Sequence, residues 1–134
     1  GGLPDSLAVA PSAPALAAAG LGTDGGVEFH AEGTCPVALV GRRARLASED
    51  NCGRCVPCRE GSTQLTGLLR DVYGGDFDDD AIRELCRTMR VSSVCDFGRH
   101  AVRPTLTAMA AFETDFRAHA DGRCPAGACA EVGG

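Results

Sequence analysis

The chain has 134 residues, 13 Lys or Arg against 18 Asp or Glu, a formal net charge of −5 and eight cysteines. At this length we expect one domain, and burial of roughly 65–70% of the unfolded surface is enough for a core. With no basic excess and few aromatic residues, the chain has neither the charge nor the stacking side chains of a nucleic-acid-binding groove. It also contains no run of about 18 apolar residues, the length that a membrane-spanning helix needs.

Residues 1–33 differ from the rest, because Ala, Gly and Pro dominate and all the charged residues are acidic. We expect a loop-rich connector from a preceding domain, with a short helix around Ala13–Ala19 and a short strand around Gly26–His30. A flexible linker is the alternative. Since the chain begins with Gly1 and not with Met, we also expect it to be a piece of a longer protein.

The sequence from Thr34 onward predicts helices. The first covers Pro36–Ala47, with Thr34 as its N-cap and a proline near the first helical position, where a missing N–H costs little. The second runs from Pro57 to about Tyr73 and ends at a Gly-Gly pair. Its apolar residues recur at i, i+3, i+4 and i+7, namely Leu65, Leu68, Leu69 and Val72.

Two further helices follow. The third starts at Asp78 to Asp80, and the fourth opens near Pro104 and stops at Gly122. Their apolar faces are Ile82, Leu85, Cys86 and Met89 in the third, and Leu106, Met109, Phe112 and Phe116 in the fourth. The predicted fold is therefore mainly α, a small four-helix bundle over residues 34–122 with a loop-rich Ala/Gly N-terminal segment (1–33) and a cysteine-containing tail (123–134).

Three cysteines lie within seven residues, at Cys52, Cys55 and Cys58. Disulfides fit this spacing poorly, because closely spaced thiols strain to pair and three cannot all do so. A single zinc ion more often draws its ligands as two separated pairs. A [4Fe–4S] cluster suits the spacing best, since one tight loop then supplies three thiolates and the fourth comes from elsewhere. Zinc, and free or paired thiols, remain the alternatives.

The fourth ligand has to come from the other five cysteines. Cys86 completes an apolar helical face, so we interpret it as a buried core residue. Cys95 lies in a turn-rich stretch between two predicted helices, where a thiolate can point at a cluster. We therefore select Cys95.

These motifs resemble a known family. Residues 48–61 read Ser-Glu-Asp-Asn-Cys-Gly-Arg-Cys-Val-Pro-Cys-Arg-Glu-Gly, and residues 93–98 read Ser-Val-Cys-Asp-Phe-Gly. They resemble the C-terminal iron–sulfur region of the flavin-bearing, NADH-oxidising subunit of NADH:quinone oxidoreductase (complex I) and of NAD(P)-linked hydrogenases and formate dehydrogenases. The resemblance covers nearly the whole chain, including Gly1 to Pro4, which are similar to the end of the domain that precedes this region.

The resemblance implies that Cys52, Cys55, Cys58 and Cys95 hold a [4Fe–4S] cluster. The chain would then be an electron-transfer module that relays electrons from a flavin to iron–sulfur clusters of partner subunits. Because no glycine-rich nucleotide loop is present, FMN and NAD(P)H are expected only in a missing domain or partner. We expect no catalysis by this chain alone and a cytoplasmic location, peripheral to any membrane complex.

Four groups remain: Cys35, His119, Cys124 and Cys129. His119 shares the face of Phe112 and Phe116 and so can point inward. Together the four would make a Cys₃His zinc site that ties the tail to the bundle. Idle thiols, and a disulfide between Cys124 and Cys129, are the alternatives. A structural zinc-binding interaction module without redox function is the rival interpretation of the whole chain.

Overall fold

A computed structural model of the 134-residue chain describes residues 8–19, 21 and 28–130. It is mainly helical, as predicted. In chain order the helices are α1 (Ala13–Ala18), α2 (Pro36–Asp50), α3 (Val56–Asp71), the 3₁₀ turn η2 (Val72–Gly74), α4 (Asp79–Ser92), α5 (Asp96–His100), α6 (Arg103–Ala111) and α7 (Glu113–Ala120).

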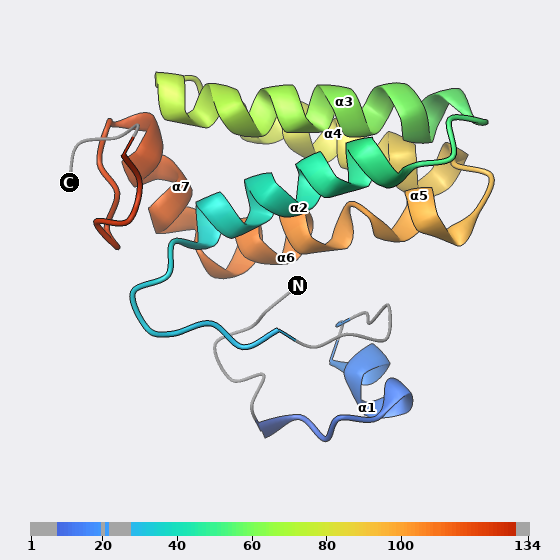
Figure 1. The fold of residues 1–134 in the computed structure, drawn as a ribbon, viewed down its shortest axis with the longest axis horizontal. Helices are drawn as coiled ribbons and strands as arrows, with labels where there is room; N and C mark the ends of the chain where they lie inside the picture. The colour runs from blue at the N-terminus through green and yellow to red at the C-terminus, as the bar shows by residue number, and fades with distance from the viewer. Residues whose placement is uncertain (1–7, 20, 22–27, 131–134) are drawn as a thin grey trace.

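The longer helices pack side by side as a small bundle (Figure 1). Helix α2 lies between α3 and α6, and α3 also packs against α4. The short helices occupy opposite ends: α5 lies beside the connection between α2 and α3, whereas α7 and the C-terminal tail lie near the start of α2 (Figure 1). This arrangement gives the bundle two ends, each of which gathers cysteines.

The helix starts follow local capping rules, with one correction. Asp78 caps α4 by accepting a hydrogen bond from the backbone N–H of Ala81 at 2.9 Å. The N-cap of α2, however, is Cys35 and not Thr34: the Cys35 Sγ lies 3.5 Å from the N–H of Ala38. The Thr34 hydroxyl instead donates to the carbonyl of Ala31 at 2.8 Å. The prediction failed because a hydroxyl is the commoner cap, and the position of the thiol depends on contacts distant in sequence.

The predicted fourth helix is two helices. Its pattern is interrupted at Phe112, where the backbone leaves the helical region (φ −128°, ψ 36°) and α7 starts in a new direction. This break turns α7 across the end of the bundle towards η2, where Phe116 stacks on Phe77 with ring centroids 5.6 Å apart. The sequence predicted one continuous helix because Phe112 and Phe116, on either side of the break, both pack against apolar neighbours and so keep the helical spacing of apolar residues. The stretch after Cys95, predicted as a loop, forms α5.

The predicted strand over residues 26–30 is not found at residues 28–30, which are irregular. Glu28 there pairs with the side chains of Arg42, Arg43 and His30. Residues 26 and 27, like Gly1 to Pro4, lie outside the described residues. Within the described ranges, no helix is long and apolar enough to cross a membrane.

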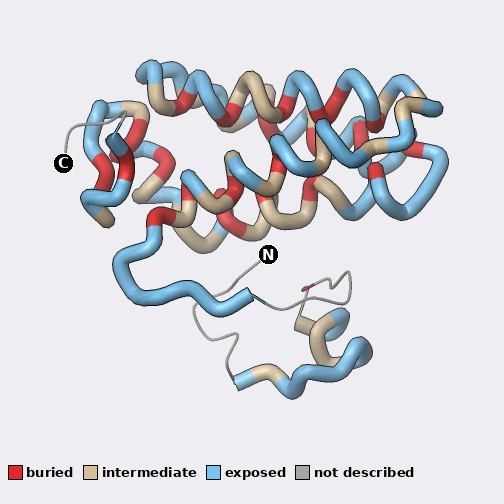
Figure 2. The backbone as a smooth tube through the Cα atoms, in the orientation of Figure 1, coloured by how far each residue is buried: buried red, intermediate tan, exposed pale blue. Residues whose placement is uncertain are grey.

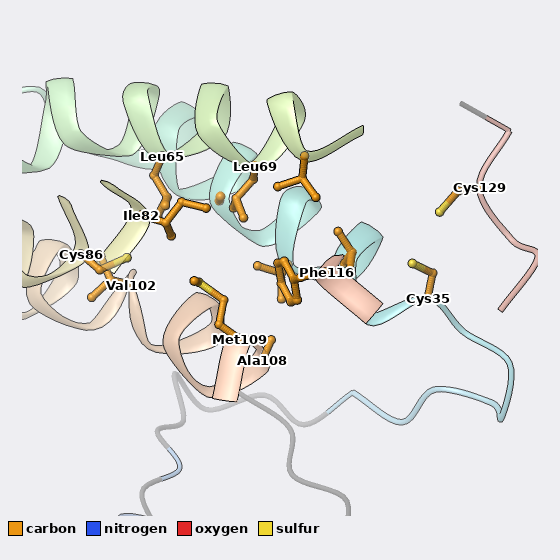
Figure 3. Close-up of a cluster of buried hydrophobic side chains, with 14 of the residues drawn as sticks. Cys35, Leu65, Leu69, Ile82, Cys86, Val102, Ala108, Met109, Phe116 and Cys129 are labelled. Atoms are coloured by element: carbon orange, nitrogen blue, oxygen red, sulfur yellow. The ribbon is translucent and has the colours of Figure 1, made fainter. Parts of the chain in front are cut away.

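The core fills the space between the helices, where the buried residues line the inward faces (Figures 2 and 3). Leu65 and Leu69 of α3 and Ile82 of α4 are at most 1% exposed. They share one buried cluster with residues of α2, α6 and α7 and with further residues of α4, among them Val40, Ala44, Cys86, Met89, Met109 and Phe116. Hydrophobic burial at these positions holds the two ends of the bundle at a fixed separation.

A leucine pair tests this core. Leu65→Ala, at a residue 1% exposed, should lower the free energy of unfolding by about 2–5 kcal/mol, because the substitution leaves a cavity. Leu46→Ala is the matched control at a residue 40% exposed and should change it by less than about 0.5 kcal/mol. Urea titration followed by circular dichroism measures both. Equal effects would contradict this description of the core.

Candidate functional site

The connection between α2 and α3 is a tight loop that carries Cys52 and Cys55. Gly53 has φ +72°, a left-handed conformation that a side chain would strain. The side chain of Asn51 accepts the N–H of Gly53 at 3.0 Å, and the Arg59 guanidinium donates to the carbonyl of Gly53 at 2.9 Å. These bonds fix the turn between the first two thiols of the motif.

The motif then enters α3. Cys55 is the N-cap residue, and Cys58 lies in the first turn after a proline. Backbone N–H groups at a helix start have no partner within the helix and carry partial positive charge, which favours an anion at this position. Cys58 is 5% exposed, whereas Cys52 is exposed.

Gly98 of α5 packs directly against this helix start. A Cβ built on Gly98 would lie 2.9 Å from the Cβ of Cys58 and 2.5 Å from the Oγ of Ser93. Arg99, the next residue, donates to the carbonyl of Ser93 at 3.0 Å and to that of Val94 at 3.4 Å. The absence of a side chain at Gly98 therefore allows the segment that carries Cys95 to lie against α3.

The thiols of Cys52, Cys55 and Cys95 act electrostatically on the thiol of Cys58. Burial raises the pKa of Cys58, and the charges of Cys55, Cys95 and Cys52 raise it further. The pKa of Cys55 is lowered because its thiolate accepts hydrogen bonds from the backbone N–H groups of Val94 and Cys58. A lowered pKa favours the thiolate, which is the form that binds metal. The structure thus brings Cys95 to the motif that lies some 40 residues before it in sequence.

Cys86 lies elsewhere. It is fully buried in the core between α4 and its neighbours (Figure 3), and burial raises its pKa to about 12. Its thiol stays protonated at neutral pH. The prediction that Cys86 is a core residue is confirmed.

The opposite end of the bundle gathers a second set of ligands. The ligand atoms of Cys35, His119, Cys124 and Cys129 all lie within 4.8 Å of one another, and all four residues are buried. For comparison, Zn–S bonds of about 2.3 Å separate the ligands of a tetrahedral site by roughly 3.8 Å. Within the described part of the chain, this is the one group of three or more such residues close enough to share a single ion. Figure 3 shows the sulfur atoms of Cys35 and Cys129 facing each other.

The orientation of His119 suits a metal ligand. Its Nδ1 lies 2.7 Å from the carbonyl of Asp115, and since a carbonyl only accepts, Nδ1 carries the proton. In the neutral ring Nε2 then has a lone pair that points into the group, where it accepts a hydrogen bond from the Cys35 thiol at 3.3 Å. Tyr73 packs edge-on against the ring with centroids 5.4 Å apart. A hydrogen bond at the second nitrogen is the usual support of a histidine ligand.

The pKa is lowered for one thiol of this second group and raised for the other two. Burial opposes ionisation of Cys124, yet hydrogen bonds from the backbone N–H groups of Ala128, Cys129 and Ala126 and from the Cys129 thiol lower its pKa to about 6. Burial raises the pKa of Cys35 and of Cys129. All eight cysteines of the chain are unpaired in the structure, so it does not contain the disulfide between Cys124 and Cys129.

Sequence reasoning missed the residues that position Cys95. Ser93, Gly98 and Arg99 were not singled out, because each acts through a contact with another segment of the chain. The one available signal was the pair of small residues on either side of Cys95, which leaves room for a close approach.

Comparison with known proteins agrees with this geometry. Residues 38–119 match the family described as the NADH-ubiquinone oxidoreductase-F iron-sulfur binding region. An NADH-quinone oxidoreductase subunit of Streptomyces coelicolor is 34% identical over 98 residues, which are 70% of this chain and 22% of that protein. The NADP-reducing hydrogenase subunit HndC of Solidesulfovibrio fructosivorans is 29% identical over 78% of this chain and 22% of its own length.

A solved structure extends the likeness to three dimensions. The crystal structure of an NAD⁺-reducing [NiFe]-hydrogenase in the H₂-reduced state superposes with a TM-score of 0.60 at 30% identity, over 64% of this chain and 16% of that one. The chain therefore has the fold of an iron–sulfur binding region. In particular, it belongs to the family of NADH-ubiquinone oxidoreductase-F iron–sulfur binding regions, and it spans about a fifth of the length of the two relatives above.

A glycine pair tests the close approach at Cys58. Gly98→Ala places a methyl group within 2.9 Å of Cys58 and Ser93, so it should displace the Cys95 segment and cause a severalfold loss of bound iron per chain. Gly67→Ala in α3 is the matched control, since a Cβ there meets nothing within 4 Å. It should keep its iron and leave the free energy of unfolding unchanged or raise it by about 0.5–1 kcal/mol. If Gly98→Ala binds as much iron per chain as the wild type, the close contact between Gly98 and Cys58 is not needed to position Cys95.

Proposed function

We propose that this chain holds one [4Fe–4S] cluster on Cys52, Cys55, Cys58 and Cys95 and serves as an electron relay. The observation that carries the proposal is the convergence of a Cys-x-x-Cys-x-x-Cys loop with the Cys95 segment at one end of the bundle, where the charges of the other three thiols raise the pKa of Cys58. The family match over residues 38–119 supports it independently.

The residues present fit such a group. Four thiols supply the donors that iron–sulfur clusters use, and the hydroxyl of Ser93 is buried beside Cys58 without a hydrogen-bond partner. A bound cluster accepts and returns one electron at a time. The chain itself holds the ligands, buries Cys58 and directs the backbone N–H groups of the α3 start towards the negative charge. No proton donor or acceptor is needed for this transfer.

We propose that the electrons come from a flavin reduced by NAD(P)H in a separate domain or partner and pass to further iron–sulfur clusters. The names of the relatives support this role, since they are subunits of a quinone oxidoreductase and of a hydrogenase. Eight unpaired cysteines suit a reducing compartment, so we place the module in the cytoplasm.

A cysteine pair tests the ligand set. Anaerobically purified protein should be brown, with about four iron and four sulfide per chain and an EPR signal on reduction by dithionite. Cys95→Ser should lose or convert the cluster. Cys86→Ser should keep it and lose about 1–3 kcal/mol of stability instead, because it puts a hydroxyl into the apolar core.

Two outcomes would count against the proposal. Loss of the cluster in Cys86→Ser, with Cys95→Ser unaffected, would reverse the choice of the fourth ligand. Colourless protein with stoichiometric zinc at the Cys52 motif would favour the rival, a structural zinc-binding module.

We propose a second, structural role for Cys35, His119, Cys124 and Cys129, which is to bind one zinc ion. The close grouping of four buried ligand atoms supports this role, as does the lone pair on Nε2 of His119, which points at the thiol of Cys35. The ion would join the start of α2 to α7 and to the tail. It would thus tie the proposed tail unit, residues 123–134, to the proposed bundle unit, residues 34–122, while residues 1–33 serve as the proposed connector.

Metal analysis tests the zinc site. Protein purified without chelator should contain about one zinc per chain, since a closed site has four protein ligands. His119→Ala and Cys124→Ser should each abolish it and lower the thermal midpoint, because binding of a structural metal adds to folding stability. His100→Ala, at an exposed histidine, is the matched control and should keep the zinc. All three variants should remain brown. Unchanged zinc content in Cys124→Ser would exclude the site.

A further inference from the structure

The hydroxyl of Ser93 is the one buried side-chain nitrogen or oxygen atom without a hydrogen-bond partner in the described part of the chain. Ser93 is 2% exposed and caps the C-terminal end of α4. Its backbone groups are satisfied, because its N–H donates to the carbonyl of Met89 at 3.1 Å and its carbonyl accepts from Arg99 at 3.0 Å. Only its hydroxyl lacks a hydrogen-bond partner, and most buried hydroxyls have one.

The unpartnered hydroxyl lies beside the proposed ligands. A Cβ built on Gly98 would lie 2.5 Å from the Oγ of Ser93 and 2.9 Å from the Cβ of Cys58. The side chains of Ser93 and Cys58 therefore both pack against the backbone of Gly98. In sequence Ser93 lies two residues before Cys95, and the backbone N–H of the next residue, Val94, lies close enough to Cys55 to lower the pKa of its thiol. Three of the proposed ligands therefore surround the segment that carries this hydroxyl.

The other buried serine at this site gives the contrast. Ser62 of α3 is 1% exposed and lies one turn after Cys58. Its hydroxyl donates to the carbonyl of Arg59 at 3.2 Å within its own helix. Ser93 has no such local acceptor, although its backbone geometry is fixed on both sides by hydrogen bonds. A hydroxyl held in this way is set to donate to a group that is not part of the polypeptide.

We propose that the Ser93 hydroxyl donates a hydrogen bond to an inorganic sulfide of the bound cluster and thereby raises its reduction potential. The inference rests on the proposed cluster. Reduction adds negative charge that spreads over the sulfurs, so a donor to sulfur stabilises the reduced form more than the oxidised form. Ser93 is thus a residue that tunes the cofactor and not one of its ligands.

The test is a redox titration of the anaerobically reconstituted 134-residue chain, followed by EPR, with iron and sulfide measured on each sample. Ser93→Ala should keep the wild-type iron content but shift the midpoint to a lower potential. Ser93→Thr, which retains a hydroxyl, should restore it. Ser62→Ala, the matched control, should leave it unchanged. After exchange into D₂O, pulsed EPR should detect, besides the deuterons of backbone N–H groups, a hydroxyl deuteron coupled to the reduced cluster in wild type and Ser93→Thr that is missing in Ser93→Ala.

The possible failures are distinguishable. A wild-type chain that takes up no iron and sulfide overturns the proposed function itself. A loaded Ser93→Ala with the wild-type midpoint and deuteron signal overturns only the role of Ser93, and an equal shift in Ser62→Ala does so by assigning the effect to packing. If Ser93→Ala does not load, Ser93→Cys replaces it: the S–H is a weaker donor, so the midpoint should again fall, and an unchanged midpoint overturns the inference.

Discussion

The approach of Gly98 to Cys58 is the contact on which the rest of the iron–sulfur end depends. At this point α5 meets the first turn of α3 with no side chain between them. The contact brings Cys95 to a loop that already carries three thiols, and it buries the hydroxyl of Ser93 in the same place. Arg99 keeps the segment there by donating to two successive carbonyls. A thiol so far away in sequence becomes a candidate ligand because of this one close approach.

The bundle converts this local contact into a stable geometry. Helices α3 and α4 carry the two halves of the site at their ends and are joined along their length by buried residues such as Leu65, Ile82 and Met89. Because a packed core resists small displacements, the positions of Cys58, at the start of α3, and of Cys95, just after α4, follow from the packing of these two helices. The ligands in the loop part of the motif, Cys52 and Cys55, need only a turn at Gly53.

The sequence predicted those parts of the molecule that depend on neighbouring residues. The helical periodicity of Leu65 to Val72, the helix start at Asp78 and the core role of Cys86 all follow from residues a few positions apart. The break at Phe112, the helix after Cys95 and the cap at Cys35 were not predicted, because each is decided by tertiary contacts. For both candidate sites, the ligand residues were proposed from the sequence. The contacts of Ser93 and Gly98, which position Cys95, are found only in the three-dimensional structure.

The two ends of the bundle place opposite demands on their thiols. At the Cys52 motif, Cys52 and Cys95 are exposed and Cys55 is half-buried, and the pKa of Cys55 is lowered, which favours its thiolate. At the Cys35 end all four ligands are buried, and burial raises the pKa of Cys35 and of Cys129. A metal there has to displace protons from buried thiols, so its binding is coupled to the packing of the tail on α7. Since the core separates the two ends, the second site can stabilise the fold without contributing charge at the first. This separation would let one small domain combine the proposed structural zinc site with the proposed cluster site.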